Sequence, residues 1–252
     1  MNTKISNTKK IDLLSKFTKE PFNSTRDFSR LLNDFSILIS QMNSDFNHPV
    51  LDFGAGSCWL SEYLVRMGFN TVAFDIHEDL YTNINNILLS DRRINPDLFH
   101  YQHGDGHQMP FEDNTFSNIF CFDTLHHMKD FDIVITEMHR ILTKGGKVLF
   151  AEPGARHAES KETIEFLSTF KKNDPEWIER SIILEDIDLI SKKSGFIDGI
   201  TIIPMQHTLN LYKCKLETWT NFRNNKNNER LIFNNMIADF NYFERVIFTL
   251  EK

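Results

Sequence analysis

The feature that most constrains the fold is a glycine turn that directly follows an apolar run. Residues 50–59 read VLDFGAGSCW, so Gly54 and Gly56 stand one residue apart at the end of a buried strand pattern. Residues 59–67 continue with the apolar spacing of a helix. A strand, a glycine turn and a helix in this order are typical of a parallel sheet, in which bare backbone approaches a ligand at the carboxyl edge.

The same alternation continues along the chain. TVAFD at 71–75 reads as a second strand, and 97–105, 116–122 and 146–152 read as three more. Residues 133–142 carry an apolar stripe at helical spacing, and the glycines of the TKGG that follows are expected to stop that helix. Because strands alternate with helices, the pattern predicts a Rossmann-like α/β fold with a mostly parallel sheet and helices on both faces.

The flanking segments complete the predicted organisation. Apolar positions recur every three and four residues in 26–42, which predicts a helix before the first strand. The region after Pro153 predicts helices around 161–171 and 185–194 and strands near 198–203 and 242–250, so the expected sheet has seven strands. We therefore expect one domain, 1–252, with a helical cap at 1–47, a core at 48–153, and a substrate side at 154–252 whose insertion, 205–240, acts with the cap as a lid.

Composition excludes several classes of protein. The net charge of -7 argues against nucleic-acid binding, and the locally basic stretch 221–230 is rich in asparagine and reads as a solvated loop. Three scattered cysteines without a C-x-x-C pair indicate neither a disulfide framework nor a zinc site. No apolar run approaches the roughly 18–20 residues that a membrane span needs, so a cytoplasmic protein is expected.

The acidic residue after the second strand indicates the kind of ligand. Asp75 lies 19 residues after Gly56, where a carboxylate accepts two hydrogen bonds from a ribose diol. A dinucleotide and an adenosyl cofactor both fit this pattern, and a turn without any ligand is the remaining alternative. Trp59 stands where the dinucleotide fingerprint has its third glycine, and its indole would crowd a pyrophosphate. The pattern therefore favours a cofactor without phosphates.

A second acidic motif follows the third strand. Asp105 ends that strand and supplies a carboxylate for an adenine amino group. Apolar residues stand between it and the next strand, and we expect them to offer a surface for the adenine ring: Met109, Pro110, Phe111 and Phe116.

With these motifs in order, residues 48–153 resemble the class I S-adenosylmethionine-dependent methyltransferases, in particular the small-molecule branch with sugar and quinone methyltransferases. The resemblance implies that LDFGAG holds the methionine part of S-adenosylmethionine, Asp75 the ribose and Gly104-Asp105 the adenine, with Phe122-Asp123 beneath the methionine end. Ser57-Cys58 departs from the usual Thr-Gly or Ser-Gly. The cofactor contacts implied in this way are Asp52, Gly54, Ala55, Gly56, Asp75, Ile76, Asp105, Gly106, His107, Phe122 and Asp123.

Candidate catalytic residues follow the fourth and fifth strands. His126 and His127 come from DTLHHM, and an imidazole near neutrality suits a general base. Glu152 ends the fifth strand on the same edge, where it could orient a histidine or hold a substrate hydroxyl. The arrangement resembles that of sugar O-methyltransferases, whose His–acid spacing favours His127. The alternative is that neither histidine is catalytic.

The sequence does not assign a role to the remaining histidines or to Arg156. A metal site built from His103, His107, His126 and His127 has no recognised ligand spacing, so no metal is predicted. Arg156 and His157 lie just past the sheet edge, and substrate contact and ordinary loop polarity are equally compatible with their positions.

These observations predict an enzyme that transfers a methyl group to an oxygen of a small molecule or a glycan-linked sugar. One alternative is methylation of nitrogen or carbon, or of a macromolecule. The sequence after the fourth strand, FDTLHH, has no N-P-P-Y-type tetrapeptide for planar nitrogen acceptors, and the acidic charge disfavours RNA. Another alternative is a cofactor-binding partner subunit without activity.

Overall fold

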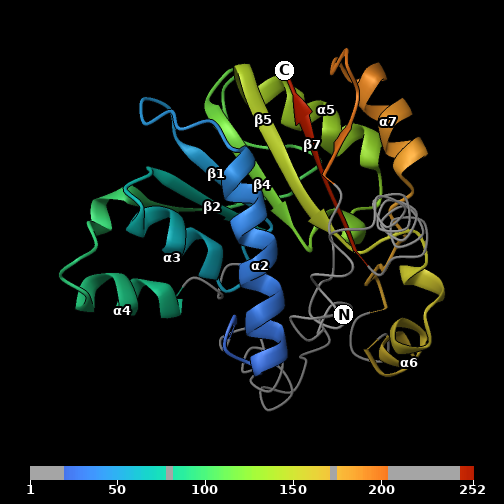
Figure 1. Cartoon of the computed structure of the whole chain (residues 1–252), viewed down its shortest axis with the longest axis horizontal. Helices are drawn as coiled ribbons and strands as arrows, with labels where there is room; N and C mark the ends of the chain where they lie inside the picture. The colour runs from blue at the N-terminus through green and yellow to red at the C-terminus, as the bar shows by residue number, and fades with distance from the viewer. Residues whose placement is uncertain (1–19, 78–81, 171–174, 204–244) are drawn as a thin grey trace, which may run out of the picture.

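The computed structural model describes residues 20–77, 82–170, 175–203 and 245–252 (Figure 1). Seven strands of these residues form one sheet in the order β3-β2-β1-β4-β5-β7-β6. All neighbours are parallel except at β7, which runs antiparallel to β5 and β6. The strands are β1 (Val50–Phe53), β2 (Thr71–Asp75), β3 (Phe99–His103), β4 (Phe116–Phe122), β5 (Leu142–Glu152), β6 (Thr201–Ile202) and β7 (Val246–Glu251). The predicted seven-stranded, Rossmann-like sheet is confirmed.

Helices cover both faces of this sheet. The α-helices are α2 (Thr25–Gln41), α3 (Trp59–Arg66), α4 (Thr82–Ser90), α5 (Phe131–Ile141), α6 (Lys161–Phe170) and α7 (Leu184–Lys193). Short 3-10 turns lie at η1 (Pro96–Leu98), η2 (Leu125–His127) and η3 (His157–Glu159). Helix α4 was not predicted, because its segment, TNINNILLS, is rich in asparagine, a weak helix former.

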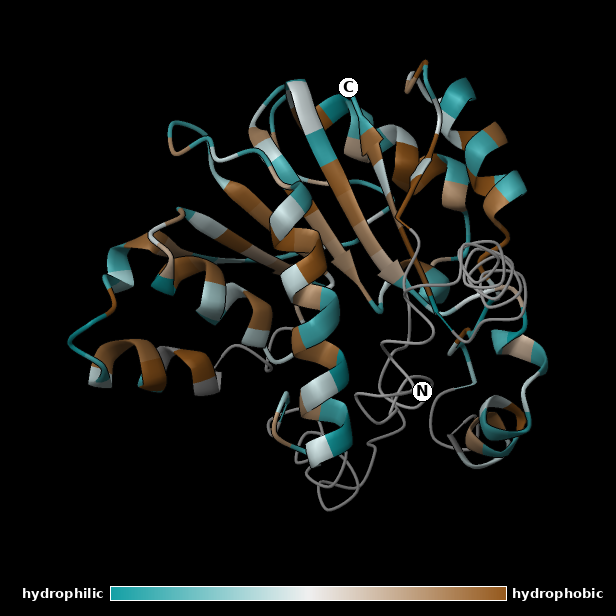
Figure 2. Cartoon of the chain, viewed as in Figure 1, coloured by the Kyte–Doolittle hydropathy of each residue, from teal (hydrophilic) through white to brown (hydrophobic). Residues whose placement is uncertain are grey.

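The core consists of two apolar layers that share the sheet. Phe120 of β4 packs with Leu38 of α2 and Leu60 of α3 on one face. Ile119, the preceding residue of β4, packs with Val134 of α5 on the other face, because side chains alternate along a strand. Figure 2 shows the result as brown central strands between helices that are banded in teal and brown.

The start of β5 corrects one sequence prediction. Helix α5 ends at Ile141, and Leu142 is already extended, with a ψ of 141°, and pairs with Phe116 of β4. The glycines of TKGG lie inside the strand, where Gly145 has a φ of +73° and its N–H donates to the carbonyl of Lys252 at 2.7 Å. The pairing with β4 and with the end of the chain replaces the expected glycine stop.

Two predicted segments have different outcomes. The helix expected at 26–42 is α2, and Ser24 caps it by accepting a hydrogen bond from the Asp27 N–H at 3.0 Å. The insertion expected at 205–240 lies outside the described residues. No helix in the described part of the chain is long and apolar enough to cross a membrane.

Candidate active site

The glycine turn joins β1 to α3 at the carboxyl edge of the sheet. Gly54 has a φ of +71°, and a Cβ there would lie 2.0 Å from the Thr124 methyl group, so only glycine fits against the loop after β4. Gly56 has a φ of +51° and faces open space, with no heavy atom within 4 Å of a Cβ position. The turn therefore packs against the protein at Gly54 and leaves free space beside Gly56.

Cys58 and Asp52 support the turn from below. Cys58 has a φ of +61°, the left-handed conformation that glycine adopts without strain, and its side chain is buried. The buried Asp52 carboxylate accepts hydrogen bonds from the N–H and hydroxyl of Ser61 at 3.1 and 2.6 Å. Burial raises the pKa of Asp52 to about 7, despite these hydrogen bonds. Its contacts with Ser61 anchor Asp52 beneath the turn, and its contact with the cofactor stays a prediction.

Asp75 closes the turn from the end of β2. Its two carboxylate oxygens accept hydrogen bonds from the backbone N–H groups of Gly56 and His77, both at 2.8 Å. Ile76, the next residue, has an apolar side chain that is 60% exposed. A carboxylate with further acceptor capacity thus lies beside an exposed apolar side chain at the same edge.

The second acidic motif lies after β3. Asp105 accepts hydrogen bonds from the backbone N–H of His107 at 2.9 Å and from its Nδ1 at 2.7 Å. These bonds hold the pKa of Asp105 below its usual value, the backbone bond most strongly. His107 Nε2 accepts from the Asp130 N–H at 3.3 Å, so the ring carries its proton on Nδ1. A Cβ on Gly106 would lie 2.6 Å from the Phe53 ring, which explains the glycine between them.

The apolar surface expected near this motif needs a correction. Met109 and Phe116 are buried in the main core, where Phe116 contacts the ring of Phe111. They were predicted from their place in the loop, but their packing against α5 and the sheet removes them from the surface. Pro110 is exposed and Phe111 is half-buried, so these two remain available as predicted, and Ile76 is a further exposed apolar side chain.

The loop after β4 begins with a strained aspartate in an ionic network. Asp123 has a φ of +48° and pairs with Arg30 of α2 at 3.2 Å and with the buried Arg245 that precedes β7. Burial alone would raise the pKa of Asp123, but the charges of Arg245 and Arg30 outweigh it and hold the pKa far below its usual value. Phe122 lies directly before it, beneath the Arg245 guanidinium.

His126 and Glu152 form a buried pair. One oxygen of Glu152 accepts hydrogen bonds from the N–H groups of Thr124 and Leu125 at 2.9 and 2.8 Å, and the other lies 2.8 Å from His126 Nδ1. Burial by itself would lower the pKa of His126. The Glu152 hydrogen bond and the surrounding carboxylates outweigh burial and raise it. The structure thus brings Glu152 to His126, whereas the spacing argument had matched it with His127.

His127 has different surroundings. Its Nδ1 lies 2.9 Å from the carbonyl oxygen of Ile178, which only accepts, so Nδ1 donates and Nε2 keeps the lone pair. The Trp177 ring packs against it with centroids 4.6 Å apart. Burial and the neighbouring His126 lower the pKa of His127. A neutral imidazole at the sheet edge is the form that accepts a proton.

Glu179 is the main site residue that the sequence analysis missed. Its buried carboxylate accepts hydrogen bonds from Trp177 Nε1 and His157 Nε2, both at 2.7 Å, and lies 3.4 Å from His126 Nε2. Trp177 and Glu179 lie in the stretch PEWIERS, 175–181, which has neither the apolar spacing of a helix nor that of a strand. A tryptophan among acidic residues is the one feature there that could have pointed to the site. His157, which the sequence left open, thereby joins the cluster.

The histidines do not gather as the metal alternative required. His103 contacts the carbonyl of Ile76, and His107 bonds to Asp105. Within the described ranges, one ligand atom each from His126, His127 and Glu179 lies within 4.8 Å of the others. Hydrogen bonds to Glu152, Ile178, Trp177 and His157 account for this grouping.

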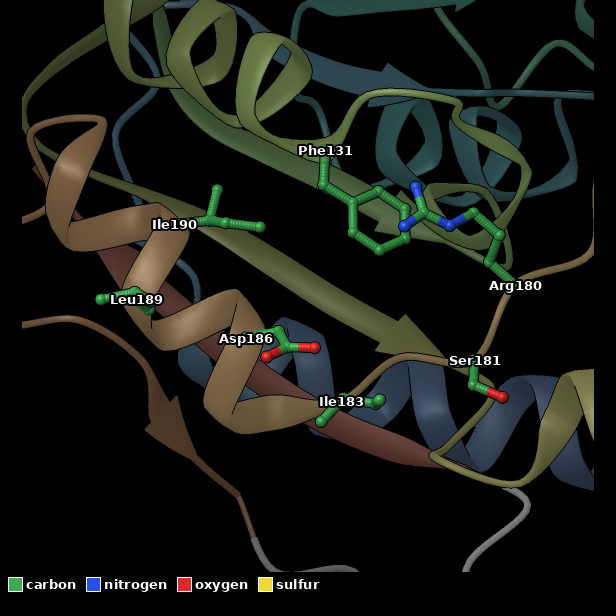
Figure 3. A pocket seen from close by; sticks show the side chains of 7 residues that line it. All are labelled: Phe131, Arg180, Ser181, Ile183, Asp186, Leu189 and Ile190. Carbon is green, nitrogen blue, oxygen red and sulfur yellow. The ribbon is translucent and has the colours of Figure 1, made fainter.

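A surface pocket of about 330 Å³ lies behind the histidine loop, between the start of α5, residues 180–183 and α7 (Figure 3). On one side of this pocket the Arg180 guanidinium stacks on the Phe131 ring at 3.9 Å. Its lining includes none of the glycine-turn residues, but Arg180, which directly follows Glu179, is part of it.

Comparison with known proteins agrees with this geometry. Residues 51–150 match the family model described as a methyltransferase domain. A malonyl-[acyl-carrier protein] O-methyltransferase from Buchnera aphidicola is 26% identical over 170 residues, which cover 66% of this chain and 63% of the relative. A ubiquinone/menaquinone biosynthesis C-methyltransferase from Saccharophagus degradans is 32% identical over 126 residues, 49% of each chain. The chain thus spans less than two thirds of the length of these relatives.

The solved structure of phosphoethanolamine N-methyltransferase 2 from Haemonchus contortus in complex with S-adenosyl-L-methionine has the same fold. The TM-score is 0.63 at 20% identity, and the match covers 95% of this chain and 56% of that one. The names of these proteins cover transfer to oxygen, carbon and nitrogen, so they leave the acceptor atom open. Residues 51–150 thus match a methyltransferase domain, and the chain shares its fold with a methyltransferase that was solved with S-adenosyl-L-methionine.

Proposed function

We propose that this protein is an O-methyltransferase that uses S-adenosylmethionine to methylate a hydroxyl group of a small molecule or a glycan-linked sugar, with His127 as the general base. The observation that carries the proposal is the state of His127, a neutral imidazole whose Nε2 keeps its lone pair. We further propose that the chain forms one domain, with residues 1–47 and 154–252 on the substrate side of the core.

The residues around the glycine turn fit S-adenosylmethionine. The open side of Gly56 leaves room for the methionine part, and among the described residues the buried Ser57 hydroxyl has no hydrogen-bond partner, which leaves it for the amino-acid end. Asp75 has acceptor capacity for ribose hydroxyls, and the exposed Ile76 offers an apolar surface for adenine. Asp105 lies on the adenine side. These are the contacts that we propose.

When bound, S-adenosylmethionine supplies a methyl group on a positively charged sulfur. An alcohol acceptor loses its proton in the reaction, and in this proposal Nε2 of His127 takes it while the new C–O bond forms and the bond from the methyl group to the sulfur breaks. Glu152 holds the η2 loop through the N–H groups of Thr124 and Leu125, and so fixes where the histidines stand. Much of the acceleration in such a site comes from alignment of the acceptor, which depends on this rigidity.

The acceptor class is tested with a panel of hydroxylated compounds: nucleotide-sugars, glycans, phenols and quinols. We expect turnover of S-adenosylmethionine with a hydroxyl acceptor, and mass spectrometry with nuclear magnetic resonance locates the new methyl group. Methylation of a quinol ring carbon would support the carbon alternative instead. Calorimetry should show binding of S-adenosylhomocysteine and none of NAD, and the reverse result would refute the cofactor assignment.

Replacing His127 with alanine tests the base. We expect kcat to fall by about 10²- to 10⁴-fold, the usual contribution of general acid–base catalysis, while affinity for S-adenosylhomocysteine stays at the parent value. Because the pKa of His127 is lowered, the acid limb of the parent's kcat profile should lie below the ordinary imidazole pKa of about 6.5. His48→Ala, at an exposed site before β1, is the matched control. A near-parent rate for His127→Ala between pH 6 and 9 would leave alignment alone as the source of catalysis.

A further inference from the structure

Four consecutive residues, 177–180, lie across the η2 histidines and are called the histidine strap below. The Trp177 ring packs on His127, and the carbonyl of Ile178 accepts its Nδ1 proton. The backbone N–H of Arg180 donates to the carbonyl of His126 at 3.0 Å, and its guanidinium donates to the carbonyl of Lys129 at 2.7 Å. Trp177, Ile178 and Arg180 thus contact the histidine loop by ring packing or through backbone hydrogen bonds. Glu179 is the strap residue that contacts it through a charged side chain.

Glu179 completes a clamp around His126. Glu152 Oε2 lies 2.8 Å from Nδ1 of His126, and Glu179 Oε2 lies 3.4 Å from Nε2. Glu152 accepts a hydrogen bond from Nδ1, and the negative charge of Glu179 attracts a proton on Nε2, so the two acids favour a ring with a proton on each nitrogen. All three side chains are buried, which strengthens the attraction relative to a surface pair.

We propose that Glu179 is a positioning residue that, together with Glu152, holds His126 as a charged imidazolium and so places a fixed positive charge beside the proton-accepting His127. The inference rests on the proposed function for its catalytic meaning, but the charge state of His126 can be measured without any reaction. It adds to the site a residue that lies outside the matched methyltransferase domain, 51–150.

The position of the clamp explains how it acts on the base. The rings of His126 and His127 lie with centroids 3.8 Å apart, so a charge on one disfavours a charge on the other. The direction of both pKa shifts agrees, raised for His126 and lowered for His127. Titratable groups face this pair from the loop after β4, from β5, from η3 and from the strap: Asp123, Glu152, His157 and Glu179. Glu179 Oε1 also lies 3.7 Å from His127 Nδ1, where its charge opposes the lowering of the His127 pKa without reversing it.

Replacing Glu179 with glutamine tests the clamp directly. Histidine side chains labelled with ¹⁵N report protonation and tautomer in long-range ¹H–¹⁵N correlation spectra of the full chain, without substrate. In the parent, we expect His126 to titrate above the ordinary imidazole pKa of about 6.5 and His127 below it, with the proton of His127 on Nδ1. In Glu179→Gln the pKa of His126 should fall, and Glu179→Asp should restore part of it. Glu165→Gln, at an exposed position of α6, is the matched control.

The pH dependence of kcat gives a second measurement. His126→Asn removes the positive charge, so the acid limb, which reports His127, should move to higher pH. A parent in which His126 titrates below about 6.5 would overturn the clamp, whether or not the variants fold, and so would a Glu179→Gln spectrum that matches the parent. These results are separate from the proposed function. If His127→Ala keeps the kcat of the parent, His127 is not the general base, but the histidine spectra of the parent and of Glu179→Gln still test the clamp.

Discussion

His126 and His127 are neighbours in the chain, but their side chains have opposite surroundings. Carboxylates lie 2.8 and 3.4 Å from the two nitrogens of His126. His127 instead bonds to a carbonyl and packs on an indole, with the Glu179 carboxylate farther away, 3.7 Å from its Nδ1. The environment of each ring, rather than its intrinsic chemistry, therefore determines which histidine is charged and which accepts a proton. The proposed mechanism depends on this difference between two residues of the same type.

Asp75 carries the prediction for cofactor affinity. Asp75→Ala removes a charged acceptor for the ribose and frees the N–H of Gly56, so affinity for S-adenosylhomocysteine should fall by about 2–3 kcal/mol, or about 30- to 150-fold. Calorimetry measures the affinity, and circular dichroism checks the fold. Asp97→Ala, in η1, should leave affinity unchanged. If Asp75→Ala binds within about twofold of the parent, the ribose assignment is wrong.

At the scale of elements, a buried arginine adds an ionic link between helix α2 and the sheet to their apolar packing. Arg245, directly before β7, pairs with Asp34 of α2 and with Asp123 after β4. Asp34 and Arg245 are almost completely buried, so each charge depends on the other for compensation. The same network reaches the loop that leads to the histidines, and it connects the N-terminal helix to the candidate active site.

Removing Arg245 should therefore be costly. Arg245→Met leaves the buried Asp34 without its cation, and we expect the free energy of unfolding to fall by about 3–5 kcal/mol in urea titrations. The double variant Arg245→Met with Asp34→Asn should recover part of this loss, because no uncompensated charge remains. Arg93→Met, in an exposed pair with Asp91, should have little effect. Equal effects at the two arginines would contradict the buried network.

At the scale of the whole molecule, the sheet collects loops from distant parts of the chain at one edge. The glycine turn, Asp75 and the η2 loop follow β1, β2 and β4, which are adjacent in the sheet. Beneath them lies Asp52, a buried acid without a buried cation partner among its described contacts. Ionisation of Asp52 therefore lowers the free energy of unfolding of the whole protein.

The raised pKa of Asp52 predicts how global stability depends on pH. Because its folded pKa, about 7, lies above the ordinary value of 3.8, the folded state binds the proton more tightly than the unfolded chain. This contribution is fully present below about pH 4 and is lost as pH rises through 7, by at most about 1.4 kcal/mol per pH unit. Asp52→Asn should therefore be more stable than the parent above pH 7 and equal to it near pH 4.

Urea titrations at several pH values compare the two proteins. Asp97→Asn serves as the control for loss of an acid at the surface. Parallel stability curves for the parent and Asp52→Asn across this range would mean that Asp52 is ionised in the folded protein at little cost.

Sequence periodicity by itself determined the class of fold. Residues 50–67 predicted a strand, a glycine turn and a helix, and the alternation after them predicted seven strands in a mostly parallel sheet. This was possible because the spacing of apolar residues differs between helices and strands. The acidic ends of the second and third strands, and the histidines after the fourth, were placed at the correct edge for the same reason. Segments with weak periods, such as α4, were missed.

Only the tertiary structure decided what surrounds each of these residues. It paired Glu152 with His126, brought Glu179 to the same ring, buried Met109 and Phe116 in the core, and extended β5 through the TKGG glycines. Such contacts join positions far apart in the chain, and they depend on how strands and loops pack rather than on any local pattern. The charge of a histidine follows from those contacts, so no local pattern in the sequence could supply it.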